Sequence, residues 1–284
     1  MNLFSRTTAL APLVAMVCAC AVASAQQIPA SGSWTLQSER SGLVNFEIRI
    51  DTPADHSSWG SDVALSRMPQ LSRSALDSSG SNVRFDVVRD AGTLQCTGYV
   101  ANGSGGGTFR YVPNPHFASE LEQRGISAPS ADDQRRMTYS DVSLAFVDVL
   151  HRYGYSRLSA EDLIRLTDHG VTGRYVTAIE QDGYHADSAE GLVRMVDHGV
   201  TADFISAMRG LGYRPSAEDL VRLIDHGVTP DFTRAMIALG YHPTADQLVR
   251  LADHGVTAEF VKHLRSRGYS ADIDQLIRLK DAGI

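Results

Sequence analysis

The stretch SAEDLIRLTDHGVT, Ser159 to Thr172, decides the fold of this chain because its last five residues recur along the sequence. DHGVT occurs at Asp168–Thr172, Asp197–Thr201, Asp225–Thr229 and Asp253–Thr257, so successive copies begin 29, 28 and 28 residues apart. A fixed period of this length is typical of repeat proteins, in which each unit buries its apolar surface only against its neighbours. The pattern therefore predicts a repeat array in this part of the chain.

Each unit contains the start and stop signals of two short helices. Ser159 is a favourable N-cap residue, and Asp162 three positions later can complete a capping box. Gly170 can end this helix with a positive φ, Thr172 can cap the next helix, and Gly183 can end that one. Helices of about nine residues are too short to persist alone. We therefore expect an α-solenoid of short antiparallel helix pairs, stabilised by stacking.

The array is predicted to span residues 113–284, with atypical units at both ends. In the degenerate first unit, 130–155, Gln134 and Arg135 stand where Leu163 and Ile164 stand in the next unit, so its outer face is more polar. At the other end, 272–284 is a half-unit cap without a partner helix. Atypical terminal units are expected of capped solenoids. The alternative is that the open C-terminal face docks a partner, such as a second copy.

Residues 31–112 have a different, two-residue period that is typical of β-strands. Alternation and hairpin signals appear in SWTLQ (33–37), LVNFEIRI (43–50), VRFDVV (83–88), TLQCTGYV (93–100) and GTFRYV (107–112). These segments predict an antiparallel β-meander, and the serine-rich span from Ser72 to Ser81 is expected to be a loop. The fold class is therefore α+β, with an N-terminal β-meander domain followed by the α-solenoid.

Composition and the N-terminus limit the classes of function. The chain has a formal charge of -7 and no basic tract, so nucleic-acid binding is not expected. Residues 1–25 resemble a secretory signal peptide, which predicts a periplasmic or secreted bacterial protein without a transmembrane helix after cleavage. The alternative is lipoprotein processing at Cys20. Cleavage leaves Cys96 as the only cysteine, and we expect it to be buried in a strand.

The repeated corner has a structural and a metal-binding interpretation. A histidine near a helix C-terminus interacts favourably with the helix dipole, whereas an aspartate there needs compensation from an arginine, a histidine or backbone N–H groups. An arginine precedes each aspartate by three residues, which places Arg165 and Asp168 on one helical face and predicts a charged ladder. The structural corner residues are Asp168, Gly170, Asp197, Gly199, Asp225, Gly227, Asp253 and Gly255. The alternative is a metal-binding ladder at His169, His198, His226 and His254, although one Asp-His pair per corner supplies few ligands.

No catalytic motif is present in the sequence. H-E-x-x-H, G-x-S-x-G and C-x-x-C are all absent, so we expect a non-enzymatic protein without a cofactor. An enzyme would require a cleft between the β domain and the array.

The repeat L-x-R-L-x-D-H-G-V-T-x-x-F-x-x-x-M-x-x-L-G-Y resembles tandem helical repeats of secreted or membrane-bound bacterial proteins. Some of these repeats follow the membrane domain of zinc metallopeptidases of the β-lactam-sensor type, and GTFRYVPNP, Gly107 to Pro115, is similar to the β segment there. The resemblance covers roughly residues 83–284, and the peptidase motif and membrane helices of that type are absent. It therefore implies an extracytoplasmic sensing or interaction module without peptidase activity. LIRLKDAGI, 276–284, is similar to the start of short oligomerisation domains.

These observations predict a module of the cell envelope that binds a protein or peptide through its helical repeats. The concave face would be lined by exposed residues of one helix series. The candidates are Arg174, Asp203, Arg209, Asp231, Arg234, Glu259 and Lys262. The alternatives are a structural envelope protein that self-associates through the C-terminal half-unit, and the histidine metal ladder.

Overall fold

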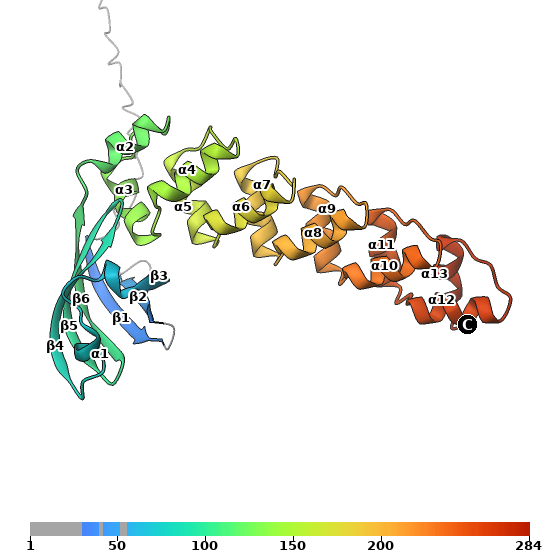
Figure 1. The fold of residues 1–284 in the computed structure, drawn as a ribbon, viewed down its shortest axis with the longest axis horizontal. Helices are drawn as coiled ribbons and strands as arrows, with labels where there is room; N and C mark the ends of the chain where they lie inside the picture. Colours follow the sequence, from blue (N-terminus) through green and yellow to red (C-terminus); the bar gives the residue numbers. More distant parts are fainter. Residues whose placement is uncertain (1–29, 40–41, 52–55) are drawn as a thin grey trace, which may run out of the picture.

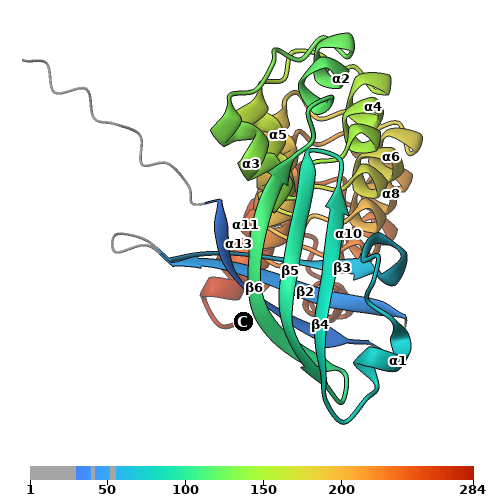
Figure 2. The same cartoon turned by 90° about the vertical axis from the view of Figure 1, so that its left-hand side faces the viewer.

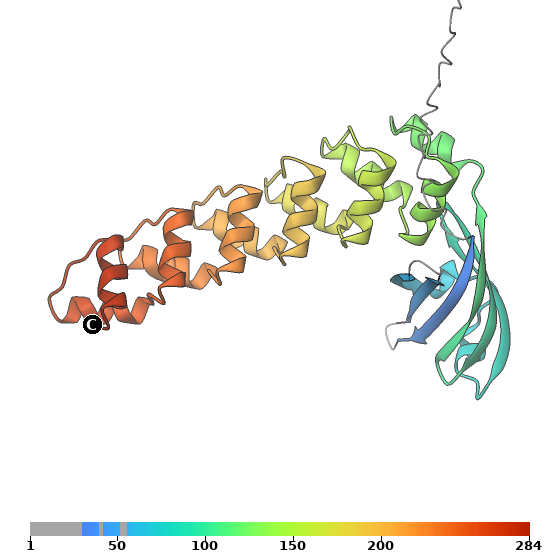
Figure 3. The same ribbon diagram turned by 180° about the vertical axis from the view of Figure 1, so that it is seen from behind.

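The computed structural model describes residues 30–39, 42–51 and 56–284. The predicted signal peptide, residues 1–25, and the alternative lipidation site at Cys20 lie outside these residues. An N-terminal antiparallel sheet is followed by short helices that extend away from it as a long array (Figure 1). The same arrangement is seen from behind in Figure 3. The fold is α+β, as predicted, with a β domain and an α-solenoid.

The described strands form one antiparallel sheet with the order β3-β2-β1-β6-β5-β4. Two three-stranded meanders, β1 to β3 and β4 to β6, are joined where β1 pairs with β6. The strands are β1 (Ser31–Ser38), β2 (Leu43–Asp51), β3 (His56–Ala64), β4 (Ser81–Arg89), β5 (Gly92–Ala101) and β6 (Ser104–Pro113). The predicted meander is therefore present, in two halves.

Two segments of the β domain differ from the sequence-based expectation. The segment His56–Ala64 has no clear alternation of large apolar residues, yet it forms β3 and pairs with β2 at the edge of the sheet. The expected loop between Ser72 and Ser81 contains the short helix α1 (Arg73–Leu76), and Leu76 is buried. Both segments are determined by contacts with the rest of the sheet, which local patterning does not contain.

The sheet curls around an aromatic cluster. Trp34 on β1 has its ring centroid 5.1 Å from that of Phe85 on β4, and Phe85 is 6.4 Å from Phe46 on β2. Because β2 and β4 are not neighbours in the sheet, this contact requires the two meanders to face each other, and Figure 2 shows them crossing. Cys96 is buried in this core, as predicted, and burial raises the pKa of its thiol.

The helices form two parallel series. The A helices are the first of each unit: α3 (Ala131–Tyr139), α5 (Ala160–Asp168), α7 (Ala189–Asp197), α9 (Ala217–Asp225), α11 (Ala245–Asp253) and α13 (Ile273–Asp281). The B helices are α2 (Phe117–Gln123), α4 (Leu144–Arg152), α6 (Gly173–Gln181), α8 (Ala202–Gly210), α10 (Pro230–Ala238) and α12 (Ala258–Ser266). From α3 and α4 onward, each helix packs on the next helix of its own series. Figure 2, viewed from the sheet end, shows the two series as separate layers.

The capping residues and glycines identified in the sequence begin and end the helices as predicted. Ser159 accepts a hydrogen bond from the amide of Asp162, and the Asp162 side chain completes the capping box. Gly170 has a φ of 75°, and the amide of Val171 donates to the carbonyl of Leu166 over 2.9 Å, which closes the helix end. The apolar stripes of successive units then merge into a core between the two layers, and the last units form a second cluster that includes Met236, Leu264 and Leu276.

The first unit is fixed to the β domain through a buried polar junction. Asp141 stands where Gly170 stands in the next unit and also has a positive φ, of 57°. Its carboxylate accepts two hydrogen bonds from Arg67, over 2.9 and 2.7 Å, and lies 3.8 Å from Nε of Arg89. Burial lowers the pKa of Arg89, and the charge of Asp141 opposes this shift. The guanidinium of Arg89 also donates to the carbonyls of Thr138 and Tyr139 over 2.7 Å.

The polar residues of the first unit contact the β domain and do not face solvent as a cap would. Gln134, which replaces the apolar residue of other units, donates to the carbonyls of Ala91 and Asn114 over 2.9 and 2.7 Å. Ala91 immediately precedes β5, and Asn114 immediately follows β6. The β domain thus covers this end of the array, and Gln134 satisfies backbone carbonyls at the contact.

Candidate functional site

The repeated DHG corner forms a ladder that connects neighbouring units. Nδ1 of His169 lies 2.9 Å from Oδ1 of Asp197, which belongs to the next unit. The equivalent pairs are His198–Asp225 at 2.8 Å, His226–Asp253 at 2.6 Å and His254–Asp281 at 2.8 Å. The histidine is therefore the group that compensates the aspartate at the helix end, one of the three possibilities expected from sequence.

The residue at the histidine position differs at the two ends of the described ladder. Ser140 takes the place of the histidine in the first unit, where burial raises the pKa of Asp168 and Ser140 partly opposes this rise. In the last described unit Asp281 accepts from His254, whereas Ala282 has no side chain that would reach further.

The ladder provides two possible metal ligands at each step, one histidine and one aspartate. Nδ1 of each histidine is already used by the aspartate of the next unit. Within residues 30–39, 42–51 and 56–284, no group of three or more His, Cys, Asp or Glu side chains is placed to hold a metal ion. Structural zinc sites need four ligands. The geometry therefore favours the structural interpretation of the corner.

The arginine ladder exists, but its partners differ from the expected ones. Arg165 and Asp168 were expected to pair along one helix, whereas Arg165 reaches across to Glu190 at the start of the next A helix, over 2.9 Å. The equivalent pairs are Arg136–Glu161, Arg194–Glu218, Arg222–Asp246 and Arg250–Asp274. From Asp197 onward, the aspartates of the corners are paired with histidines of the preceding unit instead. We call the outer face of the A helices the A face. Its arginines thus form ion pairs with acids of the neighbouring A helix.

The tyrosines after the glycines also connect units. The hydroxyl of Tyr213 donates to the carbonyl of Pro243 over 2.6 Å, and Tyr241 donates to Ala271 over 2.8 Å. Tyr155 and Tyr184 are buried. Most of these rings are therefore occupied by contacts within the array.

The candidate binding residues all lie on B helices, but they do not form one equivalent set. Arg174, Asp203, Asp231, Arg234, Glu259 and Lys262 are exposed on α6, α8, α10 and α12. Arg209 is half-buried, and its Nε donates over 3.0 Å to the carbonyl of Asp182, at the end of the preceding B helix. Arg265 makes the equivalent contact with the carbonyl of Leu239. Arg209 is therefore part of the inter-unit packing.

The exposed side of the B helices, which we call the B face, varies from unit to unit. Its second helical position is Ala145, Arg174, Asp203, Asp231 and Glu259 in successive units, and its fifth is Asp148, Thr177, Ser206, Arg234 and Lys262. Charges on the last two of these helices pair within their own helix, Asp231 with Arg234 and Glu259 with Lys262. The residues of the corners and of the A face recur from unit to unit, whereas the residues of the B face change. Its residues are consequently not required for stacking.

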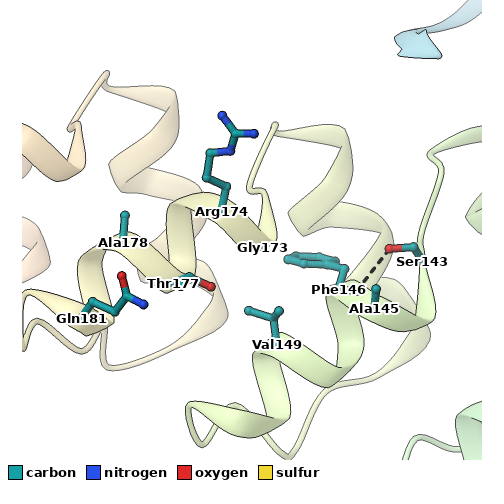
Figure 4. A pocket seen from close by; sticks show the side chains of 9 residues that line it. All are labelled: Ser143, Ala145, Phe146, Val149, Gly173, Arg174, Thr177, Ala178 and Gln181. Atoms are coloured by element: carbon teal, nitrogen blue, oxygen red, sulfur yellow. Dashed lines mark hydrogen bonds between the residues drawn. The ribbon is translucent and has the colours of Figure 1, made fainter. Parts of the chain in front are cut away.

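A groove opens on the B face between α4 and α6. It has a volume of about 510 Å³ and is lined by Ser143, Ala145, Phe146, Val149, Gly173, Arg174, Thr177, Ala178 and Gln181. Figure 4 shows Phe146 and Val149 on α4 facing Thr177 on α6, with Arg174 at the rim. The Ser143 hydroxyl is occupied because it accepts from the Phe146 amide over 3.2 Å. The base of the groove is thus largely apolar.

Sequence reasoning identified Arg174 but missed the rest of this groove. The available signal was Gly173, which stands where the other units have Leu144, Ala202, Pro230 and Ala258. A second missed cluster lies nearby, where Glu180 is 2.7 Å from Nδ1 of His185 and accepts from the hydroxyl of Tyr155 over 3.2 Å. At that position α4, α8, α10 and α12 have His151, Arg209, Ile237 and Arg265, so the repeat pattern did not indicate this cluster.

The fold and the varied B face define a helical-repeat protein with an N-terminal β domain. No protein-family model matches the chain, and no curated protein or solved structure shows significant similarity to it. Within the described residues, no helix has the length and apolar character needed to cross a bilayer.

Proposed function

We propose that this protein is a non-enzymatic interaction module of the bacterial cell envelope that binds a protein or peptide partner through the B face. The observation that carries the proposal is the contrast between the two faces of the array. Every A helix before α13 contributes an arginine paired with the next unit, whereas the B face changes its residues at each step. Elongated solenoid surfaces of this kind are used to bind extended partners.

The chemistry of the B face supports a macromolecular partner. Its exposed residues carry charges of both signs along α6 to α12, and a groove of about 510 Å³ opens between α4 and α6. A small-molecule site would be expected to be a more enclosed cavity with convergent polar groups. A peptide, in contrast, can follow several units and match their different residues in turn.

The proposal is tested by crosslinked capture of partners from the envelope of the bacterium that makes the protein. One variant carries B-face charge reversals at the exposed residues Arg174, Arg234 and Lys262. The matched control swaps an A-face pair, Arg222→Asp with Asp246→Arg, which retains the ion pair while changing the surface. We expect a partner that is captured by the wild-type chain and the control and lost by the B-face variant.

Other outcomes would point elsewhere. A partner captured equally by all three proteins would place the binding site outside the B face and overturn the proposal. Capture of the protein's own copies alone would instead support the structural alternative of self-association.

A further inference from the structure

The α4/α6 groove exists because one unit lacks a side chain at the start of its B helix. A Cβ atom built on Gly173 would lie 3.5 Å from Cγ2 of Val149 and 3.8 Å from Cδ2 of Phe146, which are ordinary contact distances. A larger side chain here would therefore extend over Val149 and Phe146. The equivalent residue one unit earlier is Leu144, so the helix start tolerates a bulky residue.

The rim of the groove carries a cation without a partner. Among the described residues, no hydrogen bond or ion pair involves the side chain of Arg174, and it is exposed. No carboxylate lines the groove, and the acid of α4, Asp148, is paired with Arg124 over 2.7 Å. The charged residues of α10, by contrast, neutralise each other. The groove thus combines an apolar base with one positive charge.

We propose that this groove binds a peptide segment of a partner protein in which an apolar side chain stands next to an acidic residue. The apolar side chain packs on Phe146 and Val149 in the space left by Gly173, and the carboxylate pairs with Arg174. Burial of one large apolar side chain contributes about 1.5–3 kcal/mol, and a guanidinium that pairs with a carboxylate adds orientation. This inference deepens the proposed function of the B face and rests on it.

The probe is a displayed library of random peptides selected on the full chain, followed by titration of synthetic copies of the selected peptides. We expect enrichment of an apolar residue adjacent to Asp or Glu. Gly173→Leu, which fills the groove with the residue of the preceding unit, and Arg174→Glu are each expected to weaken binding at least about tenfold, equivalent to about 1.4 kcal/mol. Thermal melting checks that both variants fold.

The matched control is Arg234→Glu, the reversal of an exposed arginine on α10, which should change the affinity less than about twofold because it lies outside the groove. Peptides that lose binding with Arg234→Glu but keep it with Gly173→Leu would overturn the groove assignment while supporting the B face as the binding surface. Peptides that bind all variants equally would contradict both proposals. A library without an apolar-acidic pattern would overturn the inference alone, since crosslinked capture tests the B face separately.

Discussion

His169 and Asp197, 28 positions apart in the sequence, meet with Nδ1 and Oδ1 separated by 2.9 Å. The same contact recurs at each following corner, so the DHG motif connects units and does not serve its own unit alone. This relationship explains why an acid is retained at a helix end, where it would otherwise be unfavourable.

One step of this ladder is expected to contribute weakly. Both side chains of the His198–Asp225 pair are more than a third exposed, so we expect a coupling of about 0.2–1 kcal/mol. A double-mutant cycle of His198→Ala and Asp225→Ala, followed by urea unfolding, measures it. As a control, Ala282→His adds a histidine where no following aspartate is present in the described array, and stability should stay within about 0.5 kcal/mol. Fully additive single substitutions would show that the contact is not energetically coupled.

The corner glycines are predicted to be more important than the charged pair. Gly227 has a φ of 69°, so Gly227→Ala is expected to reduce the free energy of unfolding by about 1–2 kcal/mol. Gly210 ends α8 without a positive φ, and its Cβ position is open. Gly210→Ala should therefore raise stability by up to about 1 kcal/mol. Equal effects of the two substitutions in denaturant unfolding would contradict this assignment.

The junction between the β domain and the array depends on Asp141. Asp141→Asn retains a residue type that tolerates the positive φ but removes the charge that faces Arg67 and the buried Arg89. We expect a loss of about 1–3 kcal/mol in unfolding free energy. Asp148→Asn, which removes an exposed partner of Arg124, should cost less than about 1 kcal/mol. Similar losses at the two sites would show that Asp141 is not a special contact.

The tyrosine contacts give a comparison within one residue type. Tyr241→Phe removes the hydroxyl that donates to the carbonyl of Ala271 and should cost about 0.5–1.5 kcal/mol. Tyr269 is 52% exposed and its hydroxyl has no hydrogen-bond partner among the described residues, so Tyr269→Phe should be close to neutral. Thermal unfolding of the two variants distinguishes them, and a destabilised Tyr269→Phe would indicate an additional contact at that end.

The buried thiol reports on the integrity of the β domain. Cys96 is fully buried and burial raises its pKa, so little thiolate is present at neutral pH. We expect no reaction with a thiol reagent in native buffer and rapid reaction once denaturant unfolds the sheet. Rapid labelling under native conditions would mean that the sheet opens readily around β5.

Much of this architecture was predictable because its signals are local. Ser159, Asp162 and Gly170 determine one helix through contacts within a few residues, and the 28–29 residue period then implies stacking. The sheet was predicted for the same reason wherever side chains alternate. The edge strand His56–Ala64 was missed because its pairing with β2, not its own pattern, holds it in place.

The candidate site was less predictable, since it depends on neighbours in space. Arg174 was selected from its position on a B helix, but the groove beside it requires the absence of a side chain at Gly173 opposite Val149 on another helix. Arg209 has the same charge and also lies on a B helix, yet it donates to the carbonyl of Asp182. Only the packing of successive units distinguishes an arginine that is available from one that is engaged.

The sequence by itself determined that units of two capped helices repeat after a sheet domain, because caps, glycine stops and apolar periodicity act within each unit. The tertiary structure decided which groups pair between units: His169 with Asp197, and Arg165 with Glu190 instead of Asp168. It also decided that Asp141 fixes the array to the sheet through Arg67. The physical reason is that these partners belong to successive units and meet only when one helix pair stacks on the next. A local sequence pattern does not contain the geometry of that stacking.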